Sequence, residues 1–123
     1  MSLTVSLYIR NQDDGSITNL EESIDAKQND LFGLESWRWK VWGAPIIQEM
    51  GCEILSSLSR IDIYAEQADL YQLEQELLKL LGQVERLASS LKIERVGLEF
   101  RIKNALAAIK VAKQHKNGGV WIG

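Results

Sequence analysis

EQADLYQLEQELLKLLGQVERLASS, residues 66–90, is the stretch that decides the fold. Leucine and valine recur in it at alternating spacings of three and four residues, which is the period of one face of an α-helix. The positions on this face are Leu70, Leu73, Leu77, Leu80, Val84, Leu87 and Leu91. The spacing predicts a long helix over about residues 66–90, with Leu77 and Leu80 in the middle of its buried stripe.

A second apolar strip runs beside the first on the same predicted helix. Tyr71, Leu78 and Leu81 form it, and Ala88 continues it. A helix with two apolar strips exposes one of them unless a second element or a second molecule covers it. Tyr71, Leu78 and Leu81 are therefore a candidate dimer strip. The leucine pattern lasts only three heptads between strands, which favours a core helix over a coiled-coil seam.

Alternation of apolar and polar residues predicts strands on both sides of this helix. Residues 3–9 and 96–103 alternate cleanly, with Leu3, Val5 and Leu7 on the apolar face of the first. This period of two is typical of a strand with one buried face. Residues 52–65 also predict a strand, bent near residues 56–57 and with Ile61 and Ile63 facing inward, and residues 120–122 predict a short final strand.

Capping and turn residues define the remaining elements. Asn104 is a good N-terminal cap for a helix over about residues 105–116, which the glycines at 118 and 119 would end. Pro45 is expected to start a short helix that stops at Gly51, and Asp14-Gly15 predicts a turn. A short helix over residues 20–26, capped by Asn19, is also possible.

These elements predict one α+β domain spanning residues 1–123. We expect an antiparallel or mixed sheet of four or five strands. The long helix at about 66–90 and the C-terminal helix at about 105–116 would cover it, because each half-polar strand needs a second layer on its apolar face.

The segment LESWRWKVWGA, residues 34–44, holds three of the four tryptophans and fits either a strand or a helical face. A tryptophan cluster is most often part of a core. Its alternation with Arg38 and Lys40 keeps a surface interpretation open, because Trp and Arg dominate protein interfaces. The candidate partner-binding surface is Trp37, Arg38, Trp39, Lys40 and Trp42.

Charge is unevenly distributed along the chain. The net charge is −3, from 14 Lys and Arg against 17 Asp and Glu, and residues 91–123 are basic whereas residues 1–90 are acidic. Folding of the basic end onto the acidic body explains this pattern, and a basic face for an acidic partner is the alternative. The acidic total argues against nucleic-acid binding. With no secretory signal and no apolar run of about 20 residues, the sequence predicts a cytoplasmic protein without a membrane span.

The sequence offers little chemistry. His115 is the only histidine and Cys52 the only cysteine, so neither a catalytic triad nor a zinc site can be assembled from sequence. His115 is expected to stabilise the end of the last helix by interacting with its dipole, and Cys52 is expected to be a buried thiol. Asp13-Asp14-Gly15 lacks the ligand spacing of a calcium loop. We expect no catalytic residue, no metal site and no cofactor.

Two functions remain open. The first is a non-enzymatic protein-binding module, such as a small adaptor or an immunity-type inhibitor, with another protein as partner and possible homo-oligomerisation. The second is a small-molecule or nucleotide-binding or enzymatic domain whose pocket is lined by Trp, Arg and carboxylates. A deep pocket beside Trp37 and Trp39 would favour the second, and a flat exposed patch the first.

Overall fold

The computed structural model describes residues 1–21 and 28–123 as a sheet with helices packed on it. The strands are β1 (Ser2–Arg10), β2 (Ile17–Asn19), β3 (Leu31–Leu34), β4 (Ile63–Glu66) and β5 (Gly118–Ile122). The helices are the short π-helix η1 (Arg38–Trp42), α1 (Pro45–Glu49), α2 (Glu53–Ser56), the 3-10 turn η2 (Ser57–Ser59), α3 (Ala68–Leu81), α4 (Val84–Leu91) and α5 (Arg95–Ala112). The predicted α+β class is confirmed.

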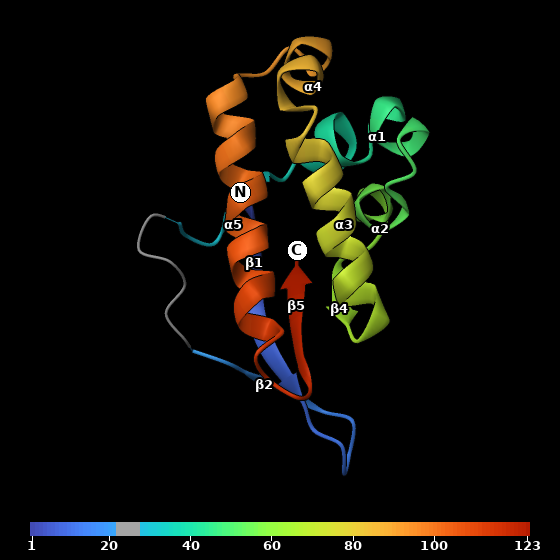
Figure 1. The fold of residues 1–123 in the computed structure, drawn as a ribbon. Coiled ribbons are helices and arrows are strands. Elements are labelled where there is room, and N and C mark those ends of the chain that lie inside the picture. The colour runs from blue at the N-terminus through green and yellow to red at the C-terminus, as the bar shows by residue number, and fades with distance from the viewer. Residues whose placement is uncertain (22–27) are drawn as a thin grey trace.

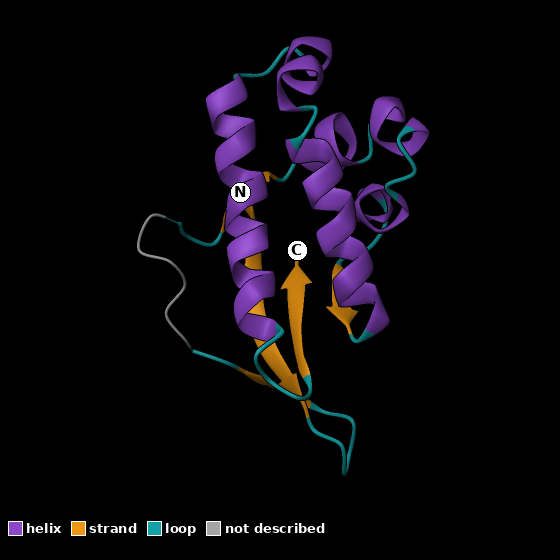
Figure 2. Cartoon of the chain, viewed as in Figure 1, coloured by secondary structure: helices purple, strands orange, loops and turns teal. Residues whose placement is uncertain are grey.

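The sheet is antiparallel throughout, in the order β2-β1-β5-β4, and β3 pairs with the start of β1. Helices α5 and α3 lie side by side across one face of it, as Figures 1 and 2 show. Alternate strand residues point into this helix layer, among them Val5 of β1, Ile63 of β4 and Val120 of β5. Both the N-terminal and the C-terminal strand thus lie in the middle of the sheet, where they hold the fold together.

The long predicted helix exists but is divided in two. Its apolar face is buried as expected, with Leu77 and Leu80 inaccessible to solvent. The helix is interrupted at Gly82 and Gln83, and α4 continues the apolar stripe through Val84 and Leu87. The leucine period persists across the break, and for this reason the pattern alone predicts one continuous helix.

The prediction of a strand over residues 96–103 is wrong, because this stretch is the first half of α5. Leu98 and Ile102 alternate with polar residues, but they also begin a four-three spacing that continues through Ala105, Ile109 and Ala112, all buried. The C-terminal helix therefore begins well before residue 105, and it ends at Ala112 rather than 116. Asn104 is not a cap. It is buried in mid-helix, where its side chain bonds Asn29 and the carbonyl of Leu31 and ties β3 to α5.

The prediction of a strand over residues 52–65 is also wrong for most of its length. Residues 53–59 form α2 and η2, and only β4 at the end is extended. A distant residue fixes this local structure. The buried carboxylate of Glu76 on α3 accepts hydrogen bonds from the backbone N–H groups of Ile54 (3.1 Å) and Leu55 (2.9 Å), which are donors of the first turn of α2.

Turn predictions fare better, with one difference. Pro45 begins α1, and Gly15 and Gly51 take positive φ values of 74° and 80° in their turns. Gly118 and Gly119, in contrast, do not cap a helix but lie within β5. The strands β2 and β3 were not predicted. The predicted helix at residues 20–26 lies largely outside the described residues, and its proposed cap Asn19 belongs to β2.

The open sheet face and its edge groove as the candidate functional site

Within residues 1–21 and 28–123, one face of the sheet has no helix layer, and we call it the open sheet face. It carries the strand residues that alternate with the core positions, namely Tyr8 and Arg10 of β1, Trp121 of β5, and Tyr64 and Glu66 of β4. Tyr8 is buried but takes no part in the main apolar core, which agrees with this placement. Aromatic side chains thus gather on the sheet face that lacks a helix layer.

Tyr8 spans three strands on this face. Its backbone pairs with Gly119, and its hydroxyl donates a hydrogen bond of 3.1 Å to Glu66 on the next strand. Glu66 also accepts from Arg10, with a shortest distance of 2.8 Å. Burial, followed by the charge of Glu66, raises the pKa of Tyr8 to about 12. The hydroxyl therefore stays protonated at neutral pH and serves as a structural donor.

Tyr64 and Trp121 form an aromatic pair beside Tyr8. Their rings are stacked at 5.5 Å and 11°, and the Tyr64 ring meets Tyr8 edge-on at 6.2 Å. Trp121 is half-buried, whereas Tyr64 retains 46% of its accessible surface. This pair presents a rigid aromatic surface to solvent.

A polar network borders the pair on its other side. The indole N–H of Trp121 donates to Asp62 at 3.0 Å, and Asp62 also pairs with the guanidinium of Arg38 at 2.6 Å. Arg38 further bonds Glu35 and the carbonyl of Leu58. The hydrogen bond from Arg38 is the main reason that the pKa of Asp62 lies below its usual range. Arg38 is thus bound within the protein and anchors η1 to the loop before β4.

A groove of about 350 Å³ runs along the outer edge of β4, and we call it the edge groove. It separates β4 from α2 and from the first turn of α3, and Tyr64 belongs both to it and to the open sheet face. The lining residues are Glu53, Ile54, Ser57, Ile61, Asp62, Ile63, Tyr64, Asp69 and Gln72. Ile61, expected to face inward, is 60% exposed here. The groove therefore combines apolar surface with three carboxylates.

The predicted tryptophan surface is only partly a surface. Trp42 is fully buried, where it stacks on Phe32 and donates to its carbonyl, so its assignment to a partner-binding surface is wrong. Trp37 is half-buried against Gly33, with the guanidinium of Arg101 5.1 Å from its ring centre. Trp39, 56% exposed, and Lys40 remain at the surface. The segment mixes core and surface because a helical turn sends neighbouring residues in different directions.

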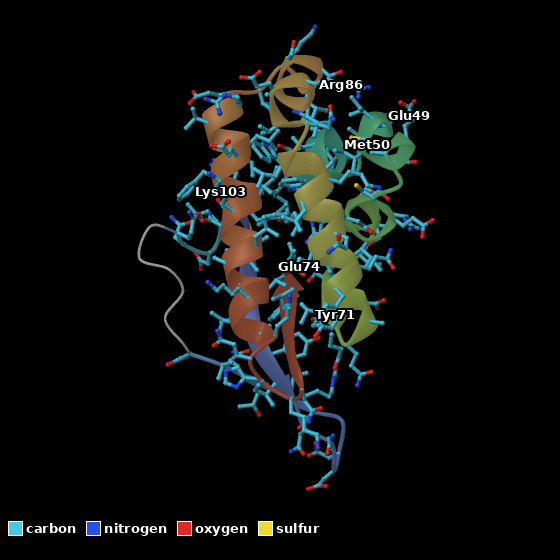
Figure 3. The ribbon with its side chains drawn as sticks, viewed as in Figure 1. Glu49, Met50, Tyr71, Glu74, Arg86 and Lys103 are labelled. Carbon is cyan, nitrogen blue, oxygen red and sulfur yellow. The ribbon has the colours of Figure 1, made fainter. Side chains whose placement is uncertain are left out.

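The predicted dimer strip is also divided. Tyr71 and Leu78 on α3 are exposed, whereas Leu81 packs against the core. Lys113, directly after α5, reaches this strip, where its ammonium lies 5.1 Å from the ring centre of Tyr71 and 3.0 Å from Glu74. Tyr71 and Glu74 are labelled on α3 in Figure 3. This contact joins the basic C-terminal helix to the acidic helix, as the charge distribution predicted.

Few reactive groups are available in the described residues. Cys52 is buried against the carbonyl of Glu76, and burial raises the pKa of its thiol to about 11. His115 lies in the turn after α5. Across residues 1–21 and 28–123, no three His, Cys, Asp or Glu side chains are grouped so as to hold a metal ion. None of the helices in the described part of the chain is both long and apolar enough to cross a bilayer.

No family model matches the chain, and neither does any curated protein or solved structure. The geometry of the open sheet face and the edge groove is therefore what supports a functional proposal. The sequence alone does not predict that Tyr8 and Tyr64 meet Trp121, because only the sheet order places β5 between β1 and β4.

Proposed function

We propose that this chain is a non-enzymatic protein-binding module of the cytoplasm, and that it contacts its partner with the open sheet face and the adjoining edge groove. The observation that carries this proposal is the aromatic and apolar surface made by exposed Tyr64 and Ile61 together with half-buried Trp121. Trp and Tyr are enriched among the residues that dominate binding energy at protein interfaces.

The surroundings of this surface suit a protein interface. Ion pairs lie on two sides of the aromatic pair, Arg10 with Glu66 and Arg38 with Asp62. An apolar centre with a polar rim is the usual composition of such an interface. The rings are already fixed by stacking on each other, so binding would cost little additional side-chain order.

The packing of the tryptophan segment weakens the alternative of a Trp-lined ligand pocket. Trp42 is inside the core and Trp37 lies against Gly33. Of the three tryptophans in this segment, Trp39 is the exposed one, and it is a candidate for an additional contact with the partner. Exposure of Tyr71 and Leu78 on α3 supports homo-oligomerisation as a separate, second contact.

Affinity capture with matched variants tests the proposal. The double variant Ile61→Ser/Tyr64→Ser removes the exposed apolar side chains of this surface, and Tyr71→Ser removes an exposed tyrosine on α3. We expect a protein from the native cell to be captured by the wild type and by Tyr71→Ser but lost with the double variant. Thermal melting of all three must first show that they are folded. Capture that is insensitive to the double variant would contradict the proposal.

A further inference from the structure

The geometry points to strand addition at β4: we infer that an extended, basic segment of another protein lies in the edge groove and pairs with β4 as an additional strand. This inference rests on the proposed function and names the chemistry of the partner. It uses the outer edge of β4, the shape of the groove beside that edge, and the charge of the groove.

The ladder register leaves β4 with an unpaired edge. The backbones of Thr4 and Gly123 exchange two hydrogen bonds of 3.1 Å, so Trp121, two residues earlier, also bonds to β1. The intervening residue Ile122 therefore bonds to Ile63 of β4. By the same alternation, the N–H and carbonyl of Tyr64 point away from β5.

The outward groups of Tyr64 meet no other backbone or side-chain partner among the described residues. Besides β5, the element that β4 packs against is α3 on the helix layer. An edge strand with unpaired groups and open space beside it can pair with another chain. The edge groove is that open space, because its lining includes Ile63 and Tyr64 of β4 on one side and Glu53, Ile54 and Ser57 of the 53–59 segment on the other.

The charge of the groove selects the class of partner. Its charged lining residues are Glu53, Asp62 and Asp69, and no Lys, Arg or His of the described part of the chain lines it. Asp62 is neutralised by Arg38, whereas Glu53 and Asp69 form no ion pair with any described residue. Two unpaired carboxylates flank the position of an added strand, so Lys or Arg on that strand would be attracted and Asp or Glu repelled.

The same charge argues against a second copy of this chain. Antiparallel pairing of two β4 strands would bring Glu53 and Asp69 of one molecule toward those of the other. Like charges brought together across an interface are destabilising. We therefore assign the edge to a different protein whose inserted strand alternates Lys or Arg with apolar residues. The basic side chains would lie toward α2 and α3, and the apolar ones beside Tyr64.

A library of eight-residue peptides tests this inference with the intact chain. In each peptide, positions of one face are Val, Ile or Thr, and positions of the other are Lys, Arg, Gln, Ser or Glu. We expect binders to be enriched in Lys and Arg over Glu and to slow hydrogen exchange of the Tyr64 amide. An N-methylated copy of the best binder, blocked on its pairing edge, should lose binding.

Charge variants provide the matched control. Glu53→Gln and Asp69→Asn should each weaken the best binder by roughly two- to fivefold, the range of an exposed ion pair, and Glu49→Gln on α1 should not. Strand addition would be overturned if no peptide binds, or if the binders are enriched in acidic residues. It would also be overturned if the peptide slows hydrogen exchange elsewhere than at β4, or if the chain dimerises through β4. Cell capture that still depends on Ile61 and Tyr64 would then leave the proposed binding function standing, so the two failures are distinguishable.

Discussion

Tyr8 on β1 lies over Gly119 on β5, and the absence of a side chain at residue 119 makes this contact possible. A Cβ at Gly119 would lie 2.5 Å from Cζ of Tyr8 and 2.9 Å from the carbonyl oxygen of Ala65. The ring can therefore cross β5, and its hydroxyl reaches Glu66 on β4. The arrangement of the open sheet face depends on this one glycine.

Gly119→Ala should destabilise the protein by about 1–3 kcal/mol, the usual cost of overpacking a fixed site. The backbone contact with Ala65 cannot be relieved by moving one side chain. Chemical denaturation measures the effect. Gly82→Ala is the control, because a Cβ there meets only ordinary contacts of 3.6 Å, and it should leave stability unchanged or slightly higher. Equal stability of the two variants would show that Tyr8 does not cross Gly119.

Gln67, between β4 and α3, has an unfavourable backbone conformation. Its φ of 52° and ψ of −126° suit glycine, and its side chain is exposed. Gln67→Gly should therefore raise the free energy of unfolding by roughly 1 kcal/mol as the strain is relieved. The same change at exposed Gln75 in mid-helix should lower it by about 1 kcal/mol. If glycine lowers the free energy of unfolding at both positions, Gln67 is not strained.

Glu76 is expected to be a main determinant of the 53–59 segment. Its buried carboxylate accepts from the backbone of Ile54 and Leu55 and from the side chain of Gln72 at 3.0 Å. Glu76→Ala leaves these buried donors unpaired and should cost about 2 kcal/mol or more. Exposed Glu53→Ala is the comparison and should cost much less. Hydrogen exchange at Ile54 and Leu55 would locate the loss, and unchanged protection there would refute this role.

Acid should weaken the open sheet face. Hydrogen bonds from Arg38 and Arg10 hold the pKa values of Asp62 and Glu66, respectively, below their ordinary 3.8 and 4.5. Groups with lowered pKa values in the folded state contribute stability above the unfolded pKa and lose it as the pH falls through the folded one. Melting temperature should thus drop below about pH 4.5, and the drop should be smaller in Asp62→Asn/Glu66→Gln. An identical drop in this variant would assign the acid sensitivity to other groups.

The sequence predicts elements best where one period is unambiguous. The alternation of Leu3, Val5 and Leu7 predicts β1, and the leucine spacing predicts the helical stretch that the structure divides into α3 and α4, because each pattern is long and buried on one face. Residues 96–103 satisfy both periods over a short window, and the helix is identified only when Ala105 and Ile109 are counted. Ala108 and Ala112 are buried, but alanine is small and weakly apolar, so the buried face of this helix is less obvious in the sequence.

The candidate site was harder to predict because distant residues assemble it. Glu76 accepts hydrogen bonds from the first turn of the helix at residues 53–56, and the order of the strands brings Tyr8, Trp121 and Tyr64 together. Neither relationship is local in sequence. The tryptophan segment has an unusual composition, yet one of its three tryptophans, Trp42, is buried in the core.

Residue-resolved hydrogen exchange of the isolated protein tests most directly that β4 has an unpaired outer edge. We predict that the amides of Ile63 and Ala65, which bond β5, exchange slowly, whereas the amide of Tyr64 between them exchanges orders of magnitude faster. The measurement should be made over a range of protein concentrations. Protection of Tyr64 equal to that of its two neighbours at the lowest concentration would contradict the account, because the edge would then be covered already within the folded chain.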